Sequence, residues 1–239
     1  MNEIRTEKIG NRWVLYSSEL LPEISEDYFS CASMEEKGLI TGRADGRGET
    51  CFYRSGEKIL ALRHYLRGGL IAKLLTDHYF GLRLKSTRAW REWHLLYDMV
   101  EMSLPVPVPV AASVVKKGLF YQADLVTEFI ESSRTLADIL DSHQLEASVW
   151  AEIGQCIRKF HDQSVFHSDL NAKNILLDEN QAIYLIDFDQ CGFRAGDAWK
   201  QDNLSRLKRS FEKFKTKQEK FYFDEVCWSN LVAGYNKAL

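Results

Sequence analysis

Short apolar stretches broken by turn residues fill residues 11–60, a pattern typical of β-strands. Strands are expected over 51–54 and 58–65, after the glycine-rich segment 41–50. A further strand pair is expected over 119–130. Residues 104–110 alternate leucine or valine with proline, and because proline fixes φ we expect this segment to be extended.

Apolar residues recur at helical spacing in other parts of the chain. The helices expected from this spacing are 88–102, 135–143, 147–163 and most of the chain after residue 197. Residues 175–177 and 183–186 instead form two apolar strands around a polar turn, which predicts a β-hairpin. This order of elements predicts an α+β fold.

Two carboxylates and one amide stand at fixed separations around the predicted hairpin. Asp169 precedes Asn174 by five residues, and Asn174 precedes Asp187 by thirteen. Because a hairpin brings its two ends together, Asn174 and Asp187 can share a hard cation through oxygen ligands. Phosphoryl transfer from a nucleotide uses such a pair at magnesium and a further carboxylate at the attacking hydroxyl. We therefore expect Asp169 to be the catalytic carboxylate; the competing interpretation is an ordinary acidic hairpin.

Bulk composition limits the class of protein. The chain has 239 residues, 45% of them hydrophobic, and no apolar run approaches the roughly 18 residues of a membrane span. The first ten residues lack a hydrophobic signal segment, so a cytoplasmic protein is expected. The five cysteines include no CxxC pair, and we expect them to be reduced and buried, without a disulfide or a metal site.

Charge is unevenly distributed, although the net charge is only −3. Residues 54–91 carry nine Lys or Arg against two acidic residues, a local +7, and residues 199–220 carry eight against three, a local +5. The remainder therefore carries −15. Two basic blocks in an acidic chain indicate an anionic partner, and the alternative is a pair of solvated faces.

The segment 167–189 resembles the catalytic segments of protein kinases. His167-Ser168-Asp169-Leu170, Asn174 and Asp187-Phe188-Asp189 follow the kinase pattern and its spacing. Asn171 and Asp189 depart from it, and no A-P-E segment follows. The resemblance implies a bilobal protein-kinase-like fold, with an antiparallel β-rich N-lobe over 1–130, a hinge near 127–131 and a mainly helical C-lobe over 131–239.

The departures point to the small-molecule and lipopolysaccharide branch of that superfamily. The chain resembles the 3-deoxy-D-manno-octulosonic acid (Kdo) kinase family of Gram-negative bacteria over about residues 40–210. The matching pieces are Leu62-Arg63-His64-Tyr65, Arg67-Gly68-Gly69-Leu70, Arg91-Glu92, Leu104-Pro105-Val106-Pro107, Phe160-His161-Asp162, His167-Ser168-Asp169-Leu170-Asn171-Ala172, Asp187-Phe188-Asp189 and Asn203-Leu204-Ser205-Arg206-Leu207.

The resemblance implies an activity and a location. The activity is ATP-dependent phosphorylation of a Kdo hydroxyl, the 4-hydroxyl, on Kdo-lipid A or its precursor, with Mg²⁺ as cofactor. The protein would work at the cytoplasmic side of the bacterial inner membrane as a peripheral protein. Its partner would be an anionic glycolipid, recruited in part by Arg67, Arg206 and Arg209, with no nucleic acid and no obligate protein partner.

The resemblance also assigns nucleotide-binding residues. Arg63 fills the place of the kinase strand lysine and would pair with Glu92, and Lys73 is the alternative for that role. A glycine-rich loop would cover the triphosphate, and backbone groups of the hinge would bind adenine. The residues expected to contact the nucleotide are Gly42, Gly46, Gly48, Arg63, Glu92, Glu128 and Ile130.

Two other functions compete with this one. The first is a kinase of another small hydroxylated acceptor, such as a heptose or an aminoglycoside antibiotic. A cationic aminoglycoside favours an acidic cleft, so the basic block 54–91 argues against it. The second is an inactive kinase-like binding module, against which the intact Asp169, Asn174 and Asp187 argue.

Overall fold

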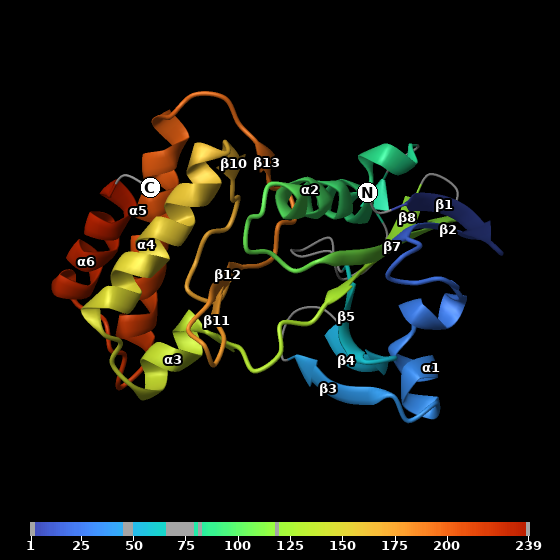
Figure 1. Ribbon diagram of the computed structural model, residues 1–239, viewed down its shortest axis with the longest axis horizontal. Coiled ribbons are helices and arrows are strands. Elements are labelled where there is room, and N and C mark those ends of the chain that lie inside the picture. The colour runs from blue at the N-terminus through green and yellow to red at the C-terminus, as the bar shows by residue number, and fades with distance from the viewer. Residues whose placement is uncertain (1–2, 45–49, 66–78, 81–82, 118–119, 238–239) are drawn as a thin grey trace. The chain divides into compact units, whose positions relative to one another are not determined.

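The computed structural model describes residues 3–44, 50–65, 79–80, 83–117 and 120–237. The chain divides into two compact units (Figure 1). The first unit comprises Met1–Asp98 and Pro107–Phe129, and the second comprises Met99–Val106 and Ile130–Leu239. An antiparallel sheet in the first unit and a mainly helical second unit confirm the predicted α+β fold class.

The first unit is built on one antiparallel sheet. Its strands are β1 (Ile4–Ile9), β2 (Arg12–Ser17), β3 (Ile40–Ala44), β4 (Thr50–Ser55), β5 (Lys58–His64), β6 (Tyr79–Phe80), β7 (Pro109–Lys117) and β8 (Phe120–Glu128). They are ordered β1-β2-β7-β8-β5-β4-β3, and β6 pairs with β8. Helix α2 (Arg88–Glu101) begins in this unit and confirms the helix expected over 88–102.

Alternation along β5 assigns its side chains to two faces of the sheet. Leu60 and Leu62 are buried in a core that contains Phe29 and other residues of the N-terminal segment. Arg63 points the other way and meets Glu92 of α2. Because successive side chains of a strand alternate between faces, the N-terminal segment and α2 cover opposite sides of β5.

The N-terminal segment differs from the sequence prediction of strands and turns alone. It contains a 3-10 helix, η1 (Glu26–Phe29), and a short helix, α1 (Cys31–Glu36). The Ser30 side chain caps α1 by accepting a hydrogen bond from the Ser33 N–H. Six residues are too few to produce a clear helical repeat in the sequence, so α1 depends on its packing against the sheet.

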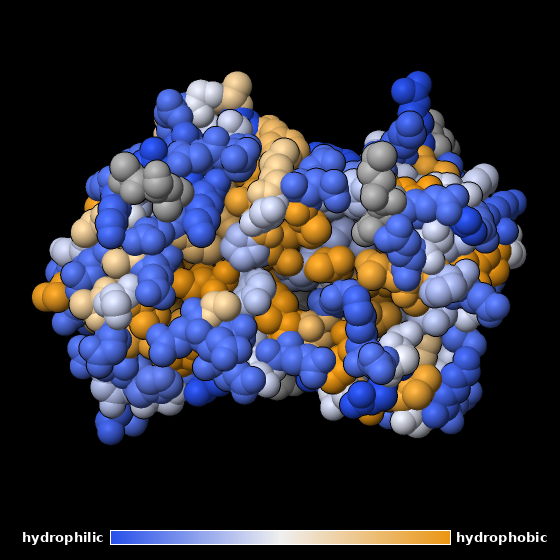
Figure 2. Space-filling view, viewed as in Figure 1, coloured by the Kyte–Doolittle hydropathy of each residue, from blue (hydrophilic) through white to orange (hydrophobic). Residues whose placement is uncertain are grey.

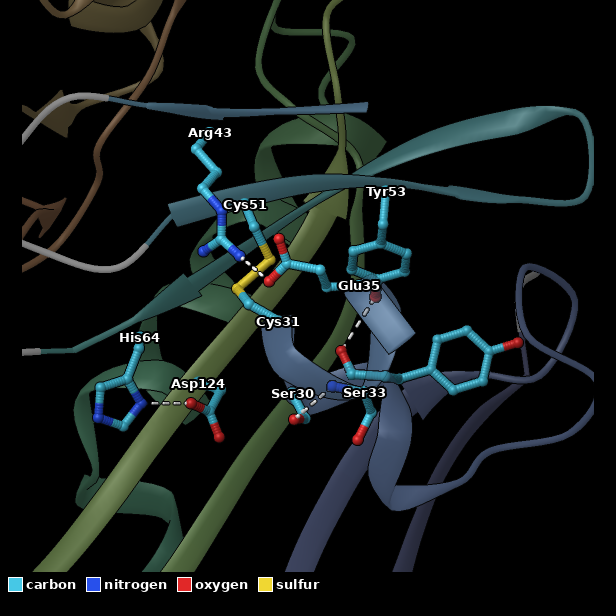
Figure 3. The surroundings of a disulfide bond; sticks show 10 residues. Ser30, Cys31, Ser33, Glu35, Arg43, Cys51, Tyr53, His64 and Asp124 are labelled. Carbon is cyan, nitrogen blue, oxygen red and sulfur yellow. Dashed lines mark hydrogen bonds and ion pairs between the residues drawn. A yellow bond between two sulfur atoms is a disulfide. The ribbon is translucent and has the colours of Figure 1, made fainter. Parts of the chain in front are cut away.

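The prediction that all five cysteines are reduced is wrong for one pair. Cys31 at the start of α1 and Cys51 on β4 form a disulfide, with their Cα atoms 6.0 Å apart (Figure 3). The two residues are separated by 20 positions and meet only because α1 packs on β4. No sequence spacing therefore revealed the pair. Cys156, Cys191 and Cys227 remain thiols and are buried.

The second unit joins helices to short strand pairs. Its elements are β9 (Arg134–Thr135), α3 (Leu136–Ser142), α4 (Ala147–Asp162), β10 (Val165–Phe166), β11 (Ile175–Leu177), β12 (Ile183–Leu185), β13 (Gly192–Phe193), α5 (Ala198–Lys217) and α6 (Glu225–Asn236). The predicted hairpin is confirmed as β11 and β12, with Ile175 opposite Leu185. The helices expected over 135–143, over 147–163 and after residue 197 are also confirmed.

Close helix packing organises the core of this unit. Gly154 of α4 and Gly234 of α6 lie at the α4–α6 contact, where a Cβ on either residue would fall 2.0 Å from a backbone carbonyl oxygen of the other helix. Trp150 packs against Phe211 and Phe223 with ring centroids 5.6 and 5.8 Å apart. Aromatic burial of this kind gives the helices a common rigid core.

Hydrophilic residues cover much of the face shown in Figure 2, and hydrophobic residues are grouped between them. Within the described ranges, every helix is too short or too polar to cross a membrane. The longest helix, α5 (Ala198–Lys217), carries Lys and Arg along its exposed side and buries Leu204, Leu207 and Phe211.

Candidate active site

The loop that carries Asp169 is shaped by its own asparagines. The Asp169 carbonyl oxygen accepts hydrogen bonds from the side-chain amides of Asn171 and Asn174, each at 2.9 Å. The Asn174 N–H donates in turn to the Asn171 carbonyl at 3.0 Å. These bonds hold a tight loop, from which the Asp169 side chain remains 55% exposed.

His167 orients this loop and is not available as a base. Its Nε2 lies 3.0 Å from the Ile186 carbonyl, and its Nδ1 accepts from the Asp169 N–H at 3.2 Å. Because a carbonyl only accepts and an amide N–H only donates, these contacts define the neutral Nε2–H tautomer. Burial lowers the pKa of His167, which keeps the ring neutral.

The hairpin places Asn174 and Asp187 at its two neighbouring ends. Asn174 precedes β11 and Asp187 follows β12, and the Ile186 N–H donates to the Asn174 carbonyl at 3.0 Å. Asp187 has φ of 65°, in the left-handed region that non-glycine residues rarely adopt. Such backbone strain is concentrated at functional sites, where the fold holds a side chain in a required direction.

Asn174 has a free oxygen of the kind that magnesium prefers. Its Nδ2 donates to the Asp169 carbonyl, so the amide orientation is determined and Oδ1 faces away from that bond. Oδ1 has no hydrogen-bond partner among the described residues. One amide oxygen and the Asp187 carboxylate fit a Mg²⁺ ion that takes its other ligands from phosphates and water. Groups of three or more acidic, His or Cys side chains suited to a metal do not occur within the described ranges.

A thiol and a hydroxyl tie this loop to the segment after Asp187. The Ser168 hydroxyl donates to the Asp189 carbonyl at 2.9 Å, and the Ser168 N–H lies 3.2 Å from the Cys191 sulfur. Ser168 immediately precedes Asp169, so the two chain segments that carry the predicted acidic residues share one hydrogen-bonded network.

Helix α5 supplies a contact that sequence reasoning missed. The Arg206 Nη2 and Nε donate to Oδ1 of Asp169 at 2.6 and 3.1 Å. Arg206 lies in a basic block expected to recruit a glycolipid, whereas in the structure it forms an ion pair with the predicted catalytic carboxylate. The nearest sequence signal was the spacing of Asn203, Arg206 and Ser210, which places all three on one side of a helix.

In the first unit, Arg63 and Glu92 meet as predicted. The Arg63 Nη1 lies 3.4 Å from Glu92 Oε1, and Glu92 is 4% exposed. The Tyr65 hydroxyl donates to the other Glu92 oxygen at 2.5 Å, and the Arg63 guanidinium lies 5.0 Å from the Tyr65 ring centroid. Burial raises the pKa of Tyr65 well above its usual value, so its hydroxyl stays a donor. The alternative cation, Lys73, lies outside the described residues.

Only some of the other residues predicted to bind the nucleotide lie within the described ranges. Gly46 and Gly48 lie outside the described residues, as does Arg67. Gly42 lies on β3 beside a bulge, and a Cβ there would come within 3.3 Å of the Phe52 ring.

Backbone donors of the hinge differ in availability. The N–H groups of Glu128 and Phe129 donate to the carbonyls of Val108 and Ile59, each at 2.9 Å. The Glu128 side chain pairs with Lys58. The Ile130 N–H has no partner in the described part of the chain. Of the two predicted hinge residues, Ile130 therefore has the free backbone donor.

Comparison with known proteins agrees with the sequence resemblance. The lipopolysaccharide kinase (Kdo/WaaP) family matches residues 32–235. A Vibrio vulnificus (strain YJ016) protein named 3-deoxy-D-manno-octulosonic acid kinase is 41% identical over 97% of this chain and 98% of its own length. Proteins of the same name from Haemophilus influenzae (strain 86-028NP) and Vibrio cholerae serotype O1 are 41% and 44% identical. They match over 95% and 80% of this chain, and over 97% and 82% of their own lengths. The chain belongs to the lipopolysaccharide kinase (Kdo/WaaP) family.

Proposed function

We propose that this protein is an ATP-dependent 3-deoxy-D-manno-octulosonic acid kinase that phosphorylates the 4-hydroxyl of Kdo on Kdo-lipid A or its precursor. The name shared by its full-length relatives supports the acceptor. The observation that carries the chemistry is the exposed Asp169 carboxylate, held in a loop that is hydrogen-bonded to the hairpin between Asn174 and Asp187.

Asp169 orients the acceptor hydroxyl and takes its proton late in phosphoryl transfer. It suits this role because its carboxylate is exposed while its backbone is fixed by Asn171 and Asn174. Asn174 Oδ1 and the Asp187 carboxylate would hold Mg²⁺, which when bound neutralises charge on the phosphates. His167 fixes the loop and takes no proton, because both ring nitrogens are engaged.

The first unit supplies most of the nucleotide contacts in this proposal. Arg63 is 31% exposed in its side chain while its partner Glu92 is buried, so the guanidinium is anchored at one side and can bind α- and β-phosphates at another. Gly42, Gly46 and Gly48 would cover the triphosphate. Adenine would bind to the backbone of the hinge, where the free N–H of Ile130 supports Ile130 over Glu128 as the donor.

The acceptor class is tested by competition between substrates. Purified protein is incubated with γ-labelled ATP, Mg²⁺ and detergent-solubilised Kdo-lipid IVA, and parallel reactions contain a heptose or an aminoglycoside. Label is expected in the Kdo-lipid alone. Faster labelling of heptose or aminoglycoside would contradict the proposed acceptor, and failure to label any acceptor, with intact ATP binding, would favour the inactive binding module.

We also propose that the protein acts as a peripheral protein at the cytoplasmic side of the inner membrane. The exposed cations of α5, such as Arg209 and Lys213, are suited to an anionic glycolipid in a bilayer surface. Reversing both charges should reduce activity on Kdo-lipid in anionic liposomes, with a smaller effect at high salt because exposed charges are screened. Equal activity of wild type and the charge-reversed variant across a salt series would show that the cations of α5 are only solvated and do not bind the glycolipid.

A further inference from the structure

The guanidinium of Arg206 is engaged along only one of its edges. Its Nε and Nη2 both donate to Oδ1 of Asp169. A guanidinium has further N–H donors on the edge formed by Nη1 and Nη2. Nη1 has no hydrogen-bond or ion-pair partner within the described ranges, Nη2 carries a second N–H beside the one donated to Asp169, and the Arg206 side chain is 46% exposed. A second oxyanion can therefore reach it.

Helix α5 holds Arg206 in position against the loop. One turn before it, Asn203 accepts from the His167 N–H at 3.3 Å and donates to the His167 carbonyl at 2.9 Å. One turn after it, the Ser210 hydroxyl accepts from the Ala172 N–H at 3.2 Å. These contacts flank Arg206 on the same side of the helix, so the base of the side chain is fixed on the loop of Asp169.

The ligand for the open edge is identified by its chemistry and place. A planar guanidinium edge matches a carboxylate through two parallel hydrogen bonds. Asp169, on the other edge, is the group that meets the acceptor hydroxyl in the proposed function. A ligand on the open edge therefore lies on the acceptor side, and the acid in the relatives' printed name carries a carboxylate.

We infer that Arg206 binds the carboxylate of the acceptor sugar acid and thereby places its hydroxyl at Asp169. This inference rests on the proposed function and makes Arg206 a specificity-determining residue. A neutral sugar leaves the open edge unpaired, and an acidic sugar fills it. One side chain thus orients the catalytic carboxylate and selects the acceptor.

A cycle of enzyme and substrate changes tests the inference. Wild type, Arg206→Gln and Arg206→Lys are assayed with solubilised Kdo-lipid IVA and with the same lipid whose Kdo carboxylate is converted to a carboxamide. With the acid, Arg206→Gln should raise KM for the acceptor by roughly 10- to 100-fold, as expected for loss of a charged hydrogen bond. Arg206→Lys keeps the charge without the planar edge, so it should raise KM for the acceptor less than Arg206→Gln does. Lys8→Gln, an exposed cation on β1 outside both basic blocks, serves as the control, and the Kd for ATP should be unchanged throughout.

The carboxamide separates this role from the effect of Arg206 on Asp169. Any loss of activity that the Arg206 substitution causes through Asp169 affects both acceptors equally, so it cancels when the two acceptors are compared. With the carboxamide, wild type should show the raised KM, and Arg206→Gln should raise it little further. An equal loss on both acceptors would overturn the inference and place Arg206 at Asp169 or at the transferred phosphoryl group. A wild-type protein that phosphorylates neither acceptor would instead contradict the proposed function, and the inference with it.

Discussion

Asp169 is held by groups that lie at different distances from it along the chain. Asn171 and Asn174 are local and bind its backbone carbonyl, whereas Arg206 is 37 residues away and binds its carboxylate. The local contacts follow from the loop sequence. The distant one depends on how α5 docks, which explains why only the tertiary structure revealed it.

Replacing Asp169 tests its chemical role. Asp169→Asn should keep the loop, because the backbone carbonyl still accepts both amides, but it removes the base. Turnover should fall by about 10²- to 10⁴-fold, the usual contribution of a positioned acid or base. Steady-state kinetics measure the loss, and equilibrium titration should give an unchanged Kd for ATP. Asp141→Asn, at an exposed position, is the control. Near-normal turnover in a folded Asp169→Asn protein would remove Asp169 from this role.

Arg63 and Glu92 are predicted to act together on the nucleotide. Arg63→Ala should raise KM for ATP and reduce turnover, because it removes the phosphate-binding cation. Glu92→Gln should have a smaller effect of the same kind, because Arg63 then loses its buried anchor. Arg54→Ala, an exposed cation on the neighbouring strand β4, should leave KM for ATP unchanged. If Lys73→Ala raises KM for ATP and Arg63→Ala does not, Lys73 takes the role.

Among the helices and strands, the pattern of apolar residues predicted those that repeat this pattern over several turns or along paired strands. The hairpin around residues 178–180 and helix α4 repeat their apolar positions over enough residues to be recognised. Helix α1 does not, and the Cys31–Cys51 disulfide depends on α1. The spacing of residues in the sequence was therefore enough to locate the predicted metal ligands at the ends of a local hairpin. It was not enough to locate residue pairs, such as the disulfide, that form only when distant elements pack together.

The α4–α6 contact should tolerate no side chain at its two glycines. Gly154→Ala and Gly234→Ala each place a Cβ about 2 Å from a backbone oxygen of the opposite helix, so the helices must separate. We expect each variant to lower the free energy of unfolding by roughly 1–3 kcal/mol or more, which is typical of overpacking in a core. Thermal or urea denaturation measures the change. Gly192→Ala, whose Cβ would meet no atom within 4 Å, is the matched control. Wild-type stability of both helix variants would contradict the close contact.

For the molecule as a whole, buried histidines make stability depend on pH. Burial lowers the pKa of His161 from 6.5 to about 4 and also lowers that of His167. Well above pH 6.5 both are neutral in the folded and the unfolded protein, so their contribution is constant there. Between pH 6.5 and about 4 the unfolded chain binds protons first, and stability should fall, for His161 by roughly 3 kcal/mol at most.

The pH dependence can be assigned by substitution. The free energy of unfolding is measured by urea titration at several pH values from 7 to 4 for wild type, His161→Gln and the exposed-site control His143→Gln. His161→Gln should show a shallower fall between pH 6.5 and about 4 whatever its stability at pH 7, because the titrating group is gone. His143→Gln should follow wild type. An unchanged slope in His161→Gln would exclude His161 as a source of the effect.

Locating the added phosphate in the product shows whether this protein transfers phosphate from ATP to Kdo. Kdo-lipid IVA is incubated with ATP, Mg²⁺ and either wild type or Asp169→Asn, and the product is fragmented by tandem mass spectrometry. We predict a gain of one phosphate with wild type, retained on the Kdo fragment, and almost none with Asp169→Asn over the same time. No gain with wild type, or an added phosphate located on the lipid fragment, would contradict transfer to Kdo.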